Sequence, residues 1–286
     1  MDVPFRLVDV FTERPFAGNQ LCVVPETPVG TTSEQMQTIA QEIGFSETTF
    51  VTSAGGDRYT MRIFTPPQEL PFAGHPTLGT AFVLASEGTI ELSAIQTTTV
   101  GEVPVEVDLE KGFAWMRQRP PEFREVFDDR AAVAEAIGLA DEDLGDLPPQ
   151  VVSTGLAPLL VPIRDEAALR RAERDPRLVP ELARRAGAEC LYLFAIRGDG
   201  DVMARMLDPF FGIGEDPATG SAAGPLGAFL ARHALAGLPG RAIVAQGELV
   251  GRPSFLHLDV QNDGDGFVIN VGGGVRPVGE GVFRGV

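Results

Sequence analysis

The sequence feature that most constrains the fold is an internal repeat linking the two halves of the chain. The segment Gly-Asn-Gln-Leu-Cys-Val-Val-Pro at 18–25 resembles Gly-Leu-Ala-Pro-Leu-Leu-Val-Pro at 155–162, 137 positions later. Further matches keep the same order at slowly increasing offsets: 62–66 with 205–209, 74–75 with 220–221, and 101–108 with 251–259. Matches in constant order indicate tandem duplication of one α/β unit, built of strands and a central helix. Chance similarity in a chain rich in Gly and Val is the alternative.

The duplication and the length of 286 residues both favour two domains of ordinary size. We expect an N-terminal domain at 1–120 and a C-terminal domain at 121–286, with a last strand that can cross back to the first domain. The best linker candidate is 118–150, which contains two Pro-Pro pairs and a short Ala-rich helix near Arg130 to Ile137.

Two Gly/Pro-rich loops, Pro71–Gly79 and Glu215–Gly224, each run into an apolar segment of helical period. Each loop therefore predicts a helix N-terminus, where the first N–H groups have no internal partner and carry the positive end of the helix dipole. Glycine lets an anion approach these groups closely. Pseudo-twofold packing of two copies would make the loops face each other across a ligand-binding cleft.

The first half carries clear secondary-structure signals. Thr32 or Ser33 is expected to cap a helix that runs to Ile43 and ends at Gly44. Two alternating, β-branched runs flank a turn at 55–57, and they place Glu47 at the mouth of a strand. The further strands expected in this half are 5–10, 20–24, 94–99, 103–109 and 113–116.

Composition argues against several classes of function. The formal net charge is -17, with 40 acidic and 23 basic residues, whereas a nucleic-acid or anionic-membrane surface needs the opposite bias. No apolar run approaches the roughly 20 residues of a spanning helix, and no secretory signal opens the chain, so we expect a soluble, cytoplasmic protein. Cys22 and Cys190 lie in apolar runs without metal-ligand spacing, which favours buried free thiols over catalytic ones.

The titratable groups around the two loops are Glu47, His75, Glu215 and Asp216, with Ser221 as a hydroxyl. In the repeat, Glu47 corresponds to Cys190, and His75 corresponds to Ser221. The two halves therefore carry different residues at the positions of the acid/base groups, which suggests an asymmetric substrate. A glutamate lowered into a cleft would have a raised pKa suited to proton transfer.

Each of these residues also has a structural interpretation. Glu47 fits a solvated strand end, and His75 fits a neighbour of the helix cap, with Pro76 at the first helical position. Asp216 before Pro217 fits a turn starter. Ser221 fits a helix-start residue that satisfies backbone donors.

For the remaining histidines and two recurring arginines, the sequence gives weaker support for a functional role. His233 follows the apolar period of its helix and is expected to be a packed or surface histidine. His257 alternates with leucines on a strand and is expected to face solvent. Arg62 and Arg205 recur at matching points of the repeat, where a structural pair and a ligand clamp are equally open.

The same residues resemble those of the PhzF family of isomerases from phenazine biosynthesis. The matching segments cover nearly the whole chain in order: 9–11, Gly18-Asn19, Phe45 to Val51, Arg62 to Pro66, Pro71 to Gly79, and Glu215 to Gly224. The resemblance implies an α/β (α+β), diaminopimelate epimerase-like fold of two pseudo-symmetric domains, each a mixed sheet around a central helix. It also implies a homodimer that needs no metal and no organic cofactor.

Residue by residue, the resemblance implies that Glu47 is the acid/base group and that His75, Asp216 and Ser221 complete the catalytic set. The amides at Gly74 and Gly220 would hold the carboxylate of a small-molecule acid. In the PhzF enzyme, the glutamate moves a proton on trans-2,3-dihydro-3-hydroxyanthranilate. The expected function is therefore proton transfer on a small, conjugated carboxylic acid.

The related diaminopimelate epimerases and proline racemases use one thiol from each half. At the equivalent loop positions this chain has Ala73 and Thr219, and neither cysteine lies near either loop in sequence. A two-thiol racemase is therefore disfavoured, although the fold is shared. Two alternatives stay open: an epimerase or lyase on the same scaffold, and a non-catalytic protein that binds a small acid.

Overall fold

The computed structural model describes residues 2–99, 101–198, 200–210 and 214–285. The chain divides into two compact units, residues 1–117 with 272–286, and residues 118–271. No helix within the described residues is long and apolar enough to cross a membrane.

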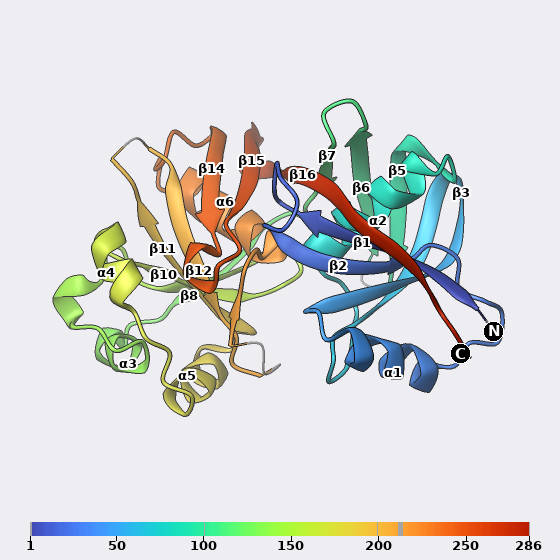
Figure 1. The fold of residues 1–286 in the computed structure, drawn as a ribbon. Helices are drawn as coiled ribbons and strands as arrows, with labels where there is room; N and C mark the ends of the chain where they lie inside the picture. The colour runs from blue at the N-terminus through green and yellow to red at the C-terminus, as the bar shows by residue number, and fades with distance from the viewer. Residues whose placement is uncertain (1, 100, 199, 211–213, 286) are drawn as a thin grey trace. The chain divides into compact units, whose positions relative to one another are not determined.

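The first unit is a mixed sheet wrapped around one buried helix (Figure 1). Its helices are α1 (Ser33–Ile43) and α2 (Gly74–Ser86). Its strands are β1 (Val3–Val10), β2 (Asn19–Val24), β3 (Glu47–Phe64), β4 (Glu69–Leu70), β5 (Ile90–Thr98), β6 (Gly101–Asp108), β7 (Phe113–Arg117) and the later part of β16 (Gly266–Phe283). The strand order is β1-β2-β3-β5-β6-β7, with β16 pairing along β1 and β4 pairing with β3.

The central helix α2 owes its position to its apolar sequence. Leu78, Ala81 and Leu84 are fully buried, and the helix packs against β1, β2, β3, β5, β6 and β7. Gly79 makes this close packing possible, because a Cβ at that position would lie 2.6 Å from Cδ2 of Leu21. Burial of this helix from all sides fixes where its N-terminus lies within the unit.

The local signals of the first unit are confirmed. Thr32 caps α1 through a capping box with Gln35, and Gly44 ends the helix at φ 67°. Glu47 is the first residue of β3. The chain folds back within β3 around residues 55–57. The contact of Thr52 Oγ1 with Thr60 Oγ1 at 2.8 Å shows this reversal.

The second unit repeats the plan around α6 (Gly220–Arg232). Its other helices are α3 (Arg130–Ala136), α4 (Glu166–Arg171), α5 (Leu178–Ala186) and the 3-10 turns η1 (Asp141–Asp143) and η2 (Glu248–Val250). Its strands are β8 (Glu122–Val126), β9 (Gln150–Ser153), β10 (Pro158–Pro162), β11 (Cys190–Ile196), β12 (Val202–Leu207), β13 (Glu215–Asp216), β14 (Gly240–Gln246) and β15 (Ser254–Asp263). The strand order is β15-β14-β12-β11-β10-β9-β8, with β13 pairing with β12.

The duplication is visible in matching pairings of the two units. β2 runs parallel to β3 with Leu21 opposite Glu47, and β10 runs parallel to β11 with Pro158 opposite Cys190. Both central helices have 13 residues and begin with glycine. The predicted fold class, a mixed sheet around a central helix in each unit, is confirmed.

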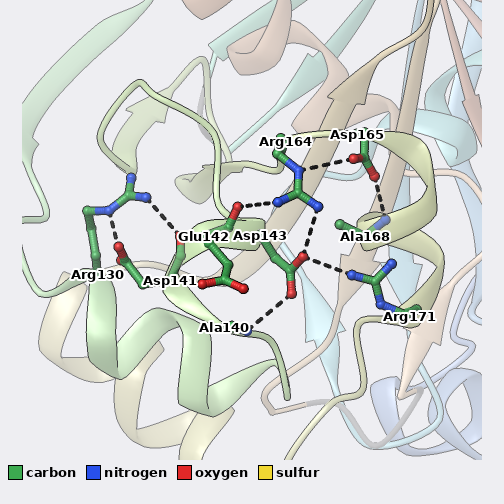
Figure 2. A network of polar contacts seen from close by, with 9 residues as sticks. All are labelled: Arg130, Ala140, Asp141, Glu142, Asp143, Arg164, Asp165, Ala168 and Arg171. Atoms are coloured by element: carbon green, nitrogen blue, oxygen red, sulfur yellow. Dashed lines mark hydrogen bonds and ion pairs between the residues drawn. The ribbon is translucent and has the colours of Figure 1, made fainter.

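The linker prediction for 118–150 is wrong, although the helix predicted inside it exists as α3. Residues 122–126 pair with β9 as β8, and α3 contributes Val133 and Ile137 to the core of the second unit. Figure 2 shows the polar network that binds this segment to α4, in which Asp143 accepts from Arg164 and Arg171. The Pro-Pro pairs and acidic residues are typical of a linker, so the composition did not indicate this packing. The packing depends on strands that follow later in the chain.

Candidate functional site

The N-terminus of α2 has no side-chain cap. Ala73 is the N-cap residue, and its side chain makes no capping hydrogen bond. Gly74 and His75 are the first two helical residues, so the helix begins two residues before the expected Pro76. Proline is tolerated there because the first turn has no intrahelical N–H bonds to lose.

Glu47 and His75 meet at this helix end. His75 Nε2 lies 3.4 Å from Glu47 Oε2, and the two side chains are only 4% and 12% exposed. Glu47 enters the site because it begins β3, next to Leu21 of β2. The prediction of a solvated strand-end carboxylate is therefore wrong, and the two sequence-predicted residues form one buried pair.

Burial lowers the pKa of His75 to about 3, and a hydrogen bond to the Gln20 backbone offsets part of this effect. Desolvation disfavours the charged imidazolium, so the ring is neutral at pH 7. A neutral histidine with such a low pKa is a poor proton acceptor.

Two further residues surround His75 that the sequence reasoning did not assign to the site. Asn19, 1% exposed, brings Nδ2 to 3.2 Å from His75 Nδ1. Ser46 Oγ donates to Asn19 Oδ1 at 3.1 Å. Their positions beside Gly18 and Glu47 in the matching motifs were the only available signal, because the contact between Asn19 and His75 spans 56 residues.

The loop before Asn19 is held by a buried carboxylate. Asp9 Oδ2 accepts a hydrogen bond from the Phe16 backbone N–H at 2.6 Å, and Asp9 is 2% exposed. Phe11 and Phe16 both have positive φ, which is uncommon for bulky residues. This constrained turn delivers Asn19 to the start of β2.

The N-terminus of α6 carries Gly220 and Ser221 as its first two residues, with Thr219 as the N-cap. Thr219 Oγ1 donates to Asp216 Oδ2 at 2.6 Å, and Gln246 Nε2 donates to the Asp216 carbonyl at 2.8 Å. Asp216 is 5% exposed and Ser221 is 8% exposed. The loop is therefore a fixed, buried turn, as the turn-starter interpretation of Asp216 also expects.

Gln246 and Tyr192 support this turn and were also missed. Tyr192 OH donates to Gln246 Oε1 at 2.8 Å, and both side chains are fully buried. Gln246 ends β14 and Tyr192 lies in β11, so no local motif marks them. Their role depends on strands that come together only in the fold.

Arg62 and Arg205 each form an ion pair with a glutamate, as the interpretation of a structural pair expects. Arg62 donates from Nε and Nη2 to the Glu69 carboxylate at 2.7 and 2.5 Å. Arg205 donates in the same way to Glu215 at 3.0 and 2.7 Å. Each pair joins a long strand to the short strand that leads towards its central helix.

The two cysteines are buried free thiols, as expected. Burial raises the pKa of Cys22 to about 12. Burial, reinforced by nearby carboxylates, raises the pKa of Cys190 well above its usual value. Ala73 and Thr219, the positions expected for racemase thiols, directly precede α2 and α6.

Among the described residues, no group of three or more His, Cys, Asp or Glu could hold a metal ion. His233 is exposed and packs against Phe229 with ring centroids 4.6 Å apart. His257 is half-buried in β15.

The structure brings Glu47 to His75 in the first unit, and Asp216, Gly220 and Ser221 together in the second. The prediction that the two loops face each other stays a prediction.

Comparison with known proteins relates this fold and these motifs to one protein family. The family model described as "Phenazine biosynthesis-like protein" (PhzC-PhzF) matches residues 8–280. The trans-2,3-dihydro-3-hydroxyanthranilate isomerase of Pseudomonas aeruginosa is 34% identical, with 91% of each chain covered. A PhzF-family structure from Bacillus anthracis is 28% identical, with a TM-score of 0.87 and 99% of each chain covered. A probable proline racemase from Agrobacterium radiobacter, 13% identical with a TM-score of 0.67 over 98% of this chain and 92% of that one, shares the fold.

The fold is that of the diaminopimelate epimerase-like proteins, and the protein is an isomerase. The chain belongs to the PhzC-PhzF family.

Proposed function

We propose that this protein is a cofactor-independent isomerase that moves a proton between two carbons of a small carboxylic acid, with Glu47 as the proton carrier. The observation that carries the proposal is the buried pair of Glu47 Oε2 and His75 Nε2, 3.4 Å apart at the start of α2. A carboxylate beside a neutral ring, at an uncapped helix end, suits proton transfer next to a bound anion.

The substrate class follows from the helix end and from the relative of named activity. The free N–H groups at Gly74 would bind a carboxylate. We propose a conjugated cyclic acid, for which trans-2,3-dihydro-3-hydroxyanthranilate, the substrate in the relative's name, is the first candidate. In the second unit, the helix end with Gly220, Ser221 and Asp216 would by itself be a second anion-binding position.

The reaction is balanced within the substrate. The Glu47 carboxylate takes a proton from one carbon, and the electron pair left behind spreads into the conjugated system. Protonated Glu47 then returns a proton to another carbon of that system, so the double bonds shift with no net gain or loss. His75 stays neutral throughout and faces the carboxylate, and the helix-end amides stabilise the developing negative charge.

The test is turnover of trans-2,3-dihydro-3-hydroxyanthranilate by wild type and by Glu47→Gln, with thermal unfolding measured in parallel. We expect kcat to fall by roughly 10²- to 10⁴-fold in the variant, with an unchanged Tm. Glu91→Gln, which removes an exposed carboxylate of the same unit, is the matched control and should retain activity. Equal turnover by Glu47→Gln would contradict the proposal.

Solvent deuterium separates the alternatives. A proton-shifting isomerase incorporates deuterium at a new carbon, whereas an epimerase incorporates it at the starting stereocentre. A non-catalytic binding protein would retain the acid without turnover, and Glu47→Gln would retain it equally well.

The family resemblance also leads us to propose a cytoplasmic homodimer. Sedimentation analysis of the purified protein and fractionation of the source cells would test these two points. A monomer, or a protein recovered outside the cytoplasm, would contradict them.

A further inference from the structure

A chain of polar side chains leads from Ser46 to Glu47 through the interior of the first unit. Ser46 Oγ donates to Asn19 Oδ1 at 3.1 Å, and Asn19 Nδ2 lies 3.2 Å from His75 Nδ1. On the other side of the ring, His75 Nε2 lies 3.4 Å from Glu47 Oε2. Asn19 and His75 are 1% and 4% exposed, so solvent does not compete for these contacts.

The hydrogen-bond roles in this chain assign the proton of the imidazole. Because the Asn19 oxygen accepts from Ser46, the amide nitrogen faces His75, and an amide nitrogen can only donate. Nδ1 must therefore accept through its lone pair. A neutral imidazole carries one proton, which leaves it on Nε2, the atom that faces Glu47.

We propose that Asn19, held by Ser46, is a positioning residue that fixes His75 as the Nε2–H tautomer, so that the ring N–H faces Glu47 Oε2 at 3.4 Å. The ring then cannot take the proton that Glu47 carries, so the carboxylate is the only proton carrier of the pair. The functional consequence, but not the tautomer itself, rests on the proposed role of Glu47.

The competing arrangement uses the Gln20 backbone. The Gln20 backbone stabilises the protonated form of His75, and the Gln20 carbonyl would accept a hydrogen bond from a proton on Nδ1. That arrangement requires Asn19 to present its oxygen to the ring and its nitrogen to Ser46. The two arrangements predict opposite protonation of the same two nitrogens, so one measurement distinguishes them.

The measurement is the ¹⁵N NMR spectrum of the imidazole. The chain has 3 histidines, so a tag-free protein with His233→Gln and His257→Gln retains His75 alone. At pH 7 we expect the chemical shift of a protonated nitrogen for Nε2 and that of an unprotonated nitrogen for Nδ1. The reverse assignment, or an equal mixture of the two forms, would overturn the proposal.

Asn19→Asp in the same background gives the converse result. Its carboxylate accepts rather than donates, so we expect the proton to move to Nδ1 and the two ¹⁵N shifts to exchange order. Ser46→Ala frees the amide to turn, and should give both tautomers. Thr154→Val, which removes a buried hydroxyl donor to Gln118 in the second unit, is the control and should leave the spectrum unchanged.

A folded Asn19→Asp variant that keeps the wild-type tautomer would overturn the proposal. The spectrum needs no substrate and no turnover. Failure of the Glu47→Gln activity test would therefore contradict the proposed function while leaving the tautomer assignment intact, and the two failures are distinguishable.

Discussion

The two loop-to-helix junctions have the same scaffold and different chemical groups. In both units a bidentate Arg–Glu pair, Arg62 with Glu69 and Arg205 with Glu215, precedes a 13-residue buried helix that begins with glycine. In the first unit, the strand next to the helix end begins with a glutamate. In the second unit, the matching strand begins with Cys190.

The difference shows how a duplicated unit can divide its tasks. Asp216, the carboxylate of the second junction, is fixed by the hydroxyl of Thr219 within its own loop at 2.6 Å. Glu47 instead faces a ring from another element, and burial holds that ring neutral. The Arg–Glu pair and the buried helix persist in both copies, whereas the contact between Glu47 and His75 belongs to the first.

The largest stability contrast should lie between the two Arg–Glu pairs. Arg205 and Glu215 are 9% and 13% exposed, and Arg205 also donates to the carbonyls of Leu169 and Ala172. Arg205→Ala leaves a buried carboxylate uncompensated and should reduce the free energy of unfolding by about 3–5 kcal/mol. Arg62→Ala, whose pair is 30% and 42% exposed, should reduce it by about 1 kcal/mol or less.

Urea unfolding of both variants gives this comparison directly. Equal losses would mean that burial does not distinguish the two pairs.

The next effect is the pH dependence that His75 adds to the first unit. Its pKa is about 3 when folded and about 6.5 when unfolded, so the unfolded chain binds the additional proton between these values. The contribution of His75 to the free energy of unfolding is therefore fully present above pH 6.5 and decreases as the pH falls. Between pH 6.5 and 4.5 the decrease is about 2 kcal/mol.

His75→Asn should flatten the curve of unfolding free energy against pH by this amount. His233→Asn is the control: partial burial lowers the pKa of His233 in the same direction, but its side chain is exposed, so the change should be small. An unaltered curve in His75→Asn would show that the ring is not held neutral by the fold.

The smallest effect should come from the hydroxyl that fixes Asp216. Thr219→Val removes a donor to a buried carboxylate and should reduce the free energy of unfolding by about 1–2 kcal/mol. Thr52→Val, which removes an exposed hydroxyl contact with Thr60, should change it by about 0.5 kcal/mol or less. Similar small losses in both variants would mean that the second junction is less rigidly held than its contacts indicate.

Sequence reasoning predicts the parts of this molecule that are encoded locally or repeated. The cap at Thr32, the turn within β3 and the two helices that follow the Gly/Pro-rich loops follow from short-range patterns. The repeat aligns Glu47 with Cys190, and the strand pairings confirm this correspondence. The assignment of Glu47 and His75 to a catalytic site stays a prediction, and the structure shows that the two side chains lie 3.4 Å apart.

The parts that sequence could not provide depend on contacts between distant segments. Asn19 reaches His75 across 56 positions, and Gln246 reaches Asp216 across 30. The segment 118–150 resembles a linker in composition, yet its strand pairs with β9 and its helix packs against α5. Burial, which sets the pKa of His75, is likewise a property of the packed unit and not of the residues beside it.

The most direct test of the division of tasks is deuterium incorporation from D₂O during turnover of trans-2,3-dihydro-3-hydroxyanthranilate. Wild type should place deuterium at a new ring carbon, and folded Glu47→Gln should incorporate none above the uncatalysed background. If Glu47→Gln incorporates deuterium at the wild-type rate, Glu47 is not the proton carrier.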